Sequence, residues 1–334
     1  MNSTDLDNIE LFRLYRPLDP TKLVDAFIEA TTHQYKAKLF NMFTPETVIQ
    51  GRTTGVIKFT TSLFAQNHDY QNQRIPDKKV RSLPVHDPDQ TQRHLVDHGW
   101  VKQDRNWWRT YLQPILEFDD PAIDLEVYVC PLLFEAARSL LPERHTYKVM
   151  RVPTIRHNPG AMWRFLGLSS SKPVFNIDSD ALPYALPYLK EWEQSKCLWF
   201  RKAHCADREI NNFSDDSVFY HPMTASEVGL KAGGLPGVAQ IRDWLCAFWW
   251  AANHGMVQNC VYYPPLKKMC SLFGRNPYGY GFDELFLMQV VFPLAFKKGI
   301  FSVFGPSDRR TYLAGLDLMA CEKADNHQVV IEGK

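Results

Sequence analysis

Two aspartates at positions i and i+2 are the most informative chemical feature of this 334-residue sequence. Asp178 and Asp180 follow the short apolar run Val174–Ile177, whose β-branched and aromatic residues are typical of a strand. A turn after Asp178 would direct both carboxylates into one cleft, where they could hold Mg²⁺ or Mn²⁺ while phosphate oxygens complete the coordination shell. The alternative is an Asx-turn, or the N-cap of a helix over Leu182–Gln194.

An arginine and three hydroxyl residues extend this candidate site. Arg164 lies on a predicted short helix over Ala161–Leu168, shortly before the aspartates. Its guanidinium could contact a diphosphate through two parallel hydrogen bonds, and the alternative is a solvated arginine on an exposed helix face. Thr60, Thr61 and Ser62 lie at the end of the first predicted strand, where they could contact a nucleoside; β-propensity accounts for them equally well.

Two acidic residues and two glycines come later in the chain. Asp283 follows a run rich in glycine and aromatic residues and begins a predicted helix. As a catalytic carboxylate Asp283 would take the proton of an attacking hydroxyl, with Glu284 as the substitute, and the alternative is a helix N-cap. Gly233 and Gly234 could let the backbone approach a sugar closely, and a simple turn is the alternative.

Four segments, in this order, resemble a family of small nucleotide-sugar glycosyltransferases of the GT-A fold. They are a W-R-F helix at 161–166, a strand ending in D-x-D at 174–180, the glycine pair at 233–234, and a G-x-D-E-x-F-L helix at 281–287. Pro293 follows that helix start at the spacing typical of the family. The resemblance extends over about residues 53–310 and is strongest from 161 to 293. One departure is that Ala181–Pro183 stand where the family has an arginine after D-x-D.

The resemblance implies a metal-dependent transfer of a sugar from a nucleotide-diphosphate donor, a UDP-sugar above all, to a hydroxyl group. Asp178 and Asp180 would bridge the diphosphate through Mn²⁺ or Mg²⁺, and Asp283 would serve an inverting displacement. The acceptor would be a polysaccharide or other glycan, or a hydroxylated DNA base, so nucleic acid enters only as an acceptor. The alternative is a non-catalytic sugar-nucleotide or glycan-binding protein with a degenerate GT-A site.

Strand and helix patterns alternate along the chain. Six segments have strand character: 56–64, 123–129, 146–152, 172–177, 197–202 and 300–304. Helical segments are predicted at 22–30, 107–118, 131–140, 161–168, 182–194, 238–254, 261–273 and 282–296. This alternation predicts an α/β fold, with a mixed and mostly parallel sheet flanked by helices, in which ligands bind beyond the carboxyl ends of strands. The resemblance makes this a Rossmann-like GT-A domain over 53–318, preceded by a helical extension over 1–52 and followed by a flexible tail over 319–334.

Composition and missing motifs exclude several classes of protein. The net charge of +1 provides no long-range attraction to nucleic acid or to anionic membranes. No secretory signal is recognisable, no apolar run reaches the ~20 residues of a membrane span, and seven scattered cysteines indicate reduced thiols, so we expect a cytoplasmic protein without a transmembrane segment. The phosphate-binding, dinucleotide-binding and nucleophile-elbow motifs are absent, which argues against P-loop NTPases, Rossmann dehydrogenases and α/β-hydrolases.

Two other groups of residues compete with this interpretation. His94 and His98 lie four residues apart in the long polar segment 66–106 and could bind zinc in a metal-dependent hydrolase. No glutamate follows His94, so the zinc-protease pattern is missing and a polar loop is favoured. Aromatic residues are interleaved with arginines at 105–109 and gather at 248–250, which predicts either core packing or a stacking surface for sugar rings or bases.

Overall fold

The computed structural model divides into two compact units. It describes residues 18–64, 108–151, 160–186, 198–201, 227–231, 237–254, 282–298, 301–306, 321–324 and 328–332, together with residues 189, 192, 193, 225 and 235. The central unit consists of Thr32–Leu186 and Leu235–Arg242. The composite unit is assembled from three chain segments, Met1–Thr31, Pro187–Gly234 and Asp243–Lys334.

The central unit contains a mixed, mostly parallel sheet. Its strands are β1 (Pro45–Ile49), β2 (Ile57–Leu63), β3 (Ile123–Val129), β4 (Thr146–Met150) and β5 (Val174–Ile177). They follow the order β1-β4-β3-β2-β5. Strand β2 pairs in parallel with both β3 and β5, β3 pairs in parallel with β4, and β1 pairs antiparallel with β4. This arrangement confirms the predicted α/β class with a mixed sheet flanked by helices.

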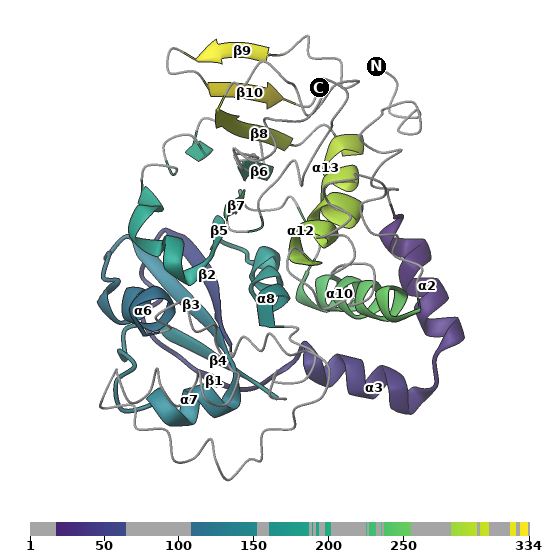
Figure 1. Ribbon diagram of the computed structural model, residues 1–334, viewed down its shortest axis with the longest axis horizontal. Helices are drawn as coiled ribbons and strands as arrows, with labels where there is room; N and C mark the ends of the chain where they lie inside the picture. Colours follow the sequence, from purple (N-terminus) through teal and green to yellow (C-terminus); the bar gives the residue numbers. More distant parts are fainter. Residues whose placement is uncertain are drawn as a thin grey trace, which may run out of the picture. The chain divides into compact units, whose positions relative to one another are not determined.

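Helical elements lie on both faces of this sheet. They are α3 (His33–Met42), the π-helical η2 (Trp108–Leu112), α6 (Gln113–Glu117), α7 (Pro131–Ala137), α8 (Gly160–Trp163), and the 3₁₀ helices η3 (Arg164–Ser169) and η4 (Ser179–Tyr184). Phe59 of β2 packs against Phe118, which follows α6, with ring centroids 5.7 Å apart, whereas the next residue, Thr60, contacts Gly167 of η3. Because neighbouring residues of a strand point to opposite faces, α6 and η3 cover opposite faces, and Figure 1 shows α6 and α8 on either side of β2 and β3.

The composite unit contributes five further strands. They are β6 (Leu198–Arg201), β7 (Glu227–Leu230), β8 (Phe301–Pro306), β9 (Cys321–Ala324) and β10 (Gln328–Glu332), in the order β7-β6-β8-β10-β9. Its helices are α2 (Pro20–Ala30), most of α10 (Val238–Asn253), α12 (Phe282–Phe286), the π-helical η6 (Leu287–Val291) and α13 (Phe292–Lys298). Asp19 caps α2 by accepting from the backbone N–H of Thr21 at 2.9 Å, so the helix begins two residues before the predicted segment 22–30.

A proline explains how α2 is attached to the long helical run of the composite unit. Pro293 has no backbone N–H, so the carbonyl of Gln289, four residues earlier, lacks its usual helical donor. The backbone N–H of Leu18 donates to this carbonyl at 2.7 Å. The helix adopts π geometry through η6, which ends two residues before the proline, as helices often do where the regular hydrogen-bond ladder is interrupted.

Two predicted segments differ from the observed elements. The region 1–52, predicted as a helical extension, also contains β1, because Thr47, Val48 and Ile49 are β-branched and pair with β4. The region 319–334, predicted as a flexible tail, contains β9 and β10, and the run Val329–Ile331 pairs antiparallel with β8. The two compact units therefore do not follow the predicted boundaries at 52/53 and 318/319.

One predicted helix begins differently from the observed elements. The predicted helix over 182–194 is replaced at its start by η4, which contains Pro183 and places Asp178 directly before a 3₁₀ turn.

Three predicted features lie outside the described residues. They are the segment 66–106 with His94 and His98, the helix over 261–273, and the pair Gly233 and Gly234. No helix among the described residues has the length and apolar character needed to cross a membrane.

Candidate functional site

Asp178 lies at the carboxyl end of β5, where the parallel strands of the central sheet end. Its backbone is extended, with φ −68° and ψ 145°, and the chain then turns as the N–H of Ala181 donates to the Asp178 carbonyl at 3.0 Å. The Asp178 side chain makes no capping hydrogen bond to η4. Asp178 thus stands in the N-cap position of η4 without the side-chain hydrogen bond of an N-cap, and its side chain is 38% exposed.

Arg164 forms an ion pair with the Asp178 carboxylate through its Nη1. It is the first residue of η3 and is only 3% exposed, so the alternative of a solvated arginine on a helix face is wrong. Its backbone N–H donates to the Ser62 hydroxyl at 3.0 Å, which joins the start of η3 to the end of β2. The structure thus brings together three residues that the sequence analysis proposed separately: Ser62, Arg164 and Asp178.

The aromatic neighbours of Arg164 fix its position. Trp163 is fully buried and donates from its indole nitrogen to the Met42 carbonyl at 2.8 Å. Phe165 is also fully buried, and the guanidinium carbon of Arg164 lies 5.5 Å from the centre of its ring. Gly167 lies so close to β2 that a Cβ atom there would stand 2.3 Å from Thr60 Cγ2. These contacts explain why a W-R-F sequence followed by glycine places a charged residue in a buried position.

Asp180 is the second residue of η4 and is half-buried. Among the residues that the structure describes, no three side chains of His, Cys, Asp or Glu gather as a metal-binding group. A divalent cation bound here by the chain's described residues would thus have only Asp178 and Asp180 as carboxylate ligands. Mg²⁺ and Mn²⁺ sites that have only two carboxylate ligands take their remaining oxygen ligands from water and from a phosphorylated substrate.

Three buried polar side chains lie on the two strands beside this edge. Thr60 and Asn176 are paired in register across β2 and β5, and Thr61 follows Thr60 on the opposite face. All three are fully buried, and the hydroxyls of both threonines and the amide of Asn176 have no hydrogen-bond partner within the described part of the chain. Buried polar groups are nearly always paired, so such groups commonly mark a bound water or ligand.

The proposed catalytic carboxylates lie in the composite unit. Asp283 and Glu284 occupy the first turn of α12, where the positive end of the helix favours negative charge. Both side chains are half-buried, and α12 begins one residue before Asp283. They belong to the composite unit, whereas Asp178 and Asp180 belong to the central unit.

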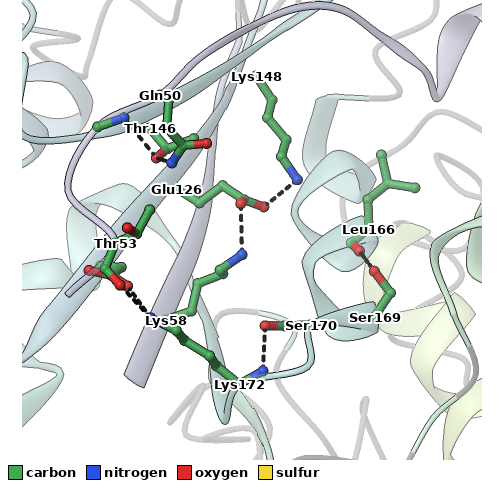
Figure 2. Close-up of polar contacts among 12 residues, drawn as sticks. Gln50, Thr53, Lys58, Glu126, Thr146, Lys148, Leu166, Ser169, Ser170 and Lys172 are labelled. Carbon is green, nitrogen blue, oxygen red and sulfur yellow. Dashed lines mark hydrogen bonds and ion pairs between the residues drawn. The ribbon is translucent and has the colours of Figure 1, made fainter. Parts of the chain in front are cut away.

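A second polar cluster was not found by sequence analysis. Glu126 of β3 binds Lys58 of β2 through Oε2 at 3.0 Å and Lys148 of β4 through Oε1 at 2.9 Å (Figure 2). Tyr128 donates its hydroxyl to Glu126 Oε1 at 2.7 Å and accepts from Lys148 Nζ at 3.2 Å. We call these four residues the lysine–glutamate cluster. The missed signal was the spacing of Asp124, Glu126 and Tyr128 at alternate positions of a strand, which places all three on one face.

The electrostatics of this cluster keep Glu126 charged. Burial alone would raise the pKa of Glu126, but the ammonium charges of Lys148 and Lys58 outweigh burial and hold this pKa below its ordinary value. Burial, together with the Glu126 charge, raises the pKa of Tyr128 well above its ordinary value, so that its hydroxyl remains a hydrogen-bond donor.

Comparisons with known proteins identify no relative. No protein-family model, no curated protein and no solved structure matches the chain. The α/β class follows from the strand order and pairing described above. A functional assignment therefore depends on the residues at the carboxyl edge of the central sheet and on their geometry.

Proposed function

We propose that this protein is a metal-dependent glycosyltransferase that moves a sugar from a nucleotide-diphosphate donor, a UDP-sugar above all, to a hydroxyl group of a glycan or another acceptor. The observation that supports this proposal best is the buried Arg164 held against Asp178 where β5 ends. Ligands of open α/β sheets bind beyond the carboxyl ends of the strands. A guanidinium at that edge is a planar donor suited to phosphate oxygens.

The roles of the residues follow from the charge that develops when a nucleoside diphosphate departs. Arg164 would bind the diphosphate and stabilise its growing negative charge from a fixed position. Asp178 and Asp180 would hold Mn²⁺ or Mg²⁺, which when bound acts as a Lewis acid on the same oxygens. Thr60, Thr61 and Ser62 would contact the nucleoside.

In the composite unit, Gly233 and Gly234 would lie against the donor sugar, and Asp283, with Glu284 as its substitute, would accept the proton of the acceptor hydroxyl. In this proposal the fold is a GT-A variant of the α/β class and the enzyme acts in the cytoplasm.

Calorimetric titration of the full chain with UDP, with and without Mn²⁺, tests the donor site. We expect UDP binding that requires Mn²⁺ and that is abolished in Asp180→Asn, since this change removes one of the two cation ligands while keeping the side-chain shape. Asp25→Asn, on the exposed surface of α2, is the matched control and leaves binding unchanged. Equal UDP affinity in Asp180→Asn and the wild type would refute the metal site.

Release of the nucleoside diphosphate from a panel of UDP-, GDP- and other nucleotide sugars tests the activity. Asp283→Asn should lower kcat by about 10²–10⁴-fold while donor affinity barely changes, because the carboxylate meets the acceptor and not the diphosphate. If Asp283 only serves the positive end of α12, asparagine costs a fraction of a kcal/mol of stability and turnover stays close to that of the wild type.

One observation favours a non-catalytic sugar-nucleotide or glycan-binding protein instead. Arg164 already neutralises Asp178, and Ala181–Pro183 provide no further cation after the aspartates. An arginine that competes with a metal ion for Asp178 would suit a site that binds its ligand without divalent cations. Metal-independent binding of a nucleotide sugar or a glycan, without turnover of any donor, would support this second function.

A further inference from the structure

We propose that the lysine–glutamate cluster is a second ligand site, which binds a small phosphate-type oxyanion on Lys58 and Lys148. Lys58, Glu126 and Lys148 have no role in the proposed function, so the inference goes beyond that function and does not depend on it. Both lysines and Glu126 belong to the central unit, and they lie on the sheet face that η3 covers.

The charges of the cluster do not balance. Two ammonium groups share the single carboxylate of Glu126, which is 4% exposed. The neighbouring carboxylate on the same face, Asp124, is itself bound by Lys172 at 2.9 Å and therefore does not compensate the cluster. Among these side chains one positive charge is in excess, and it is shared by two partly exposed ammonium groups that Glu126 holds in place.

The two ammonium groups also have hydrogen-bond donors to offer. Within the described part of the chain, Lys58 uses one of its three N–H groups, on Glu126, and Lys148 uses two, on Glu126 and Tyr128. The two side chains are 25% and 22% exposed, so both lysines are only partly buried. Lys172, by contrast, donates three hydrogen bonds, to Asp124 and to the carbonyls of Thr53 and Gly55.

The lysines are fixed before any ligand arrives. An exposed lysine loses much rotamer entropy when it binds an anion, and this loss weakens binding. Here Glu126 holds both ammonium groups through the two oxygens of one carboxylate, and the Lys148 ammonium also lies 5.1 Å from the centre of the Tyr128 ring. Most of the rotamer entropy of the two lysine side chains has thus been lost on folding, whereas surface lysines lose it when they bind an anion.

Unpartnered polar groups beside the cluster point to the same face. Glu126, Thr60 and Asn176 form one row in register across β3, β2 and β5. Thr60 and Asn176 are fully buried, and neither the Thr60 hydroxyl nor the Asn176 amide has a partner among the described residues. Buried groups of this kind are rare without a ligand or water, and both can donate hydrogen bonds to oxygen.

The chemistry of the donors indicates the class of ligand. Lysine ammoniums act as point charges, whereas a planar carboxylate is matched best by the fork of an arginine. A tetrahedral oxyanion offers acceptor oxygens in several directions, and a dianion gains more from an excess positive charge than a monoanion does. Inorganic phosphate and the phosphoryl group of a small metabolite share this chemistry.

Calorimetric titration of the full chain with inorganic phosphate, at constant ionic strength and without metal or nucleotide, tests the site. We expect saturable binding that Lys58→Met and Lys148→Met each weaken by about tenfold or more, since each removes a charged donor. Lys172→Met is the matched control and retains phosphate affinity, because that lysine has already spent its donors on the chain. Competition by methyl phosphate would show that the phosphoryl group of a metabolite suffices, and its failure would assign the site to free phosphate.

Glu126→Gln provides a test with the opposite sign and does not depend on whether the lysine variants fold. It keeps the shape of the side chain but removes the negative charge between the ammoniums, so phosphate affinity should rise by roughly tenfold or more. If the lysines serve only to neutralise Glu126, the wild type shows no phosphate binding beyond that of chloride and Glu126→Gln gains none. Either result overturns the proposal, and neither affects the UDP and Mn²⁺ measurements.

Discussion

The two faces of the central sheet differ in polarity, although helical elements cover both. On one face Phe59 and Phe175 pack with ring centroids 5.5 Å apart, and Phe118 continues the apolar layer. On the other face the alternate residues of the same strands are polar, among them Thr60 and Glu126. Both faces are buried, although strands covered on two sides are usually apolar throughout.

From this difference we infer that the apolar face provides the stability of the sheet, whereas the polar face can bind ligands. Burying Glu126 and its lysines contributes little net stability compared with well-packed apolar residues. The apolar face must therefore supply most of the hydrophobic free energy. The following predictions test this division, first on the apolar face and then on the polar one.

The largest effect is expected for Phe175→Ala. Phe175 is fully buried between strands and rings of the apolar face, so truncation should lower the free energy of unfolding by about 3–5 kcal/mol. Asn176→Ala, one residue further on the polar face, is the matched control and should cost less than about 1 kcal/mol, since its amide has no partner among the described residues. Urea unfolding measures both, and equal losses would contradict the division between the faces.

Acidification should weaken the apolar face through His145. This histidine is buried beside Phe118, its Nε2 lies 2.9 Å from the Ile115 carbonyl, and burial lowers its pKa to about 4. Between about pH 6.5 and pH 4 the unfolded chain binds a proton that the folded chain does not, so stability falls as the pH falls, by about 3 kcal/mol in all. His145→Gln should show less of this dependence in unfolding measured from pH 7 to pH 4. If His145→Gln shows the same pH dependence of stability as the wild type, His145 is not the cause of that dependence.

A smaller effect is expected for Lys172→Met on the polar face. The change leaves the buried Asp124 with only the Gly55 N–H as a partner among the described residues, at 2.8 Å, and removes the bonds to two carbonyls. Because Lys172 is itself 38% exposed, we expect a loss of only about 2 kcal/mol. Thermal unfolding at low and high salt measures it. A loss as large as that of Phe175→Ala would show that the polar face contributes to stability as much as the apolar one.

The smallest effect is expected for Thr60→Val. The change preserves the shape of the side chain and removes a buried hydroxyl that has no described partner, so the free energy of unfolding should stay within about 0.5 kcal/mol or rise slightly. The same variant should bind phosphate more weakly if the row beside Glu126 takes part in the second site. A loss of more than about 1 kcal/mol without ligand would mean that the hydroxyl is bonded in the free protein.

The sequence predicted the parallel strands well because their pattern is local. The predicted strand at 123–129 has the observed bounds, and the one at 56–64 differs by one residue at each end. The strand β1 was missed because its alternation is short and lies directly after two helices. The strand β10 was missed because its five residues gain their stability from pairing with β8, which no local pattern reports.

The site was predictable in its residue types and not in its contacts. Asp178 was found because it follows an apolar strand, but its pairing with Arg164 depends on how η3 folds back along β2. The lysine–glutamate cluster joins Lys58, Glu126 and Lys148 from three strands, so its members are adjacent only in the sheet. Contacts of this kind depend on register, which one-dimensional patterns do not contain.

The bond between Leu18 and the carbonyl of Gln289 has a consequence for the order in which the protein is made. Translation delivers the chain from its amino end, and domains fold as their residues emerge. All five strands of the central unit have left the ribosome when Ile177 has emerged. The backbone N–H of Leu18, however, cannot form its hydrogen bond to the Gln289 carbonyl until Gln289 has been synthesised. During this interval α2 has been translated but its anchoring carbonyl has not. We therefore expect a nascent chain stalled before Gln289 to protect β2 and β3 from proteases while the segment around Leu18 remains cleavable.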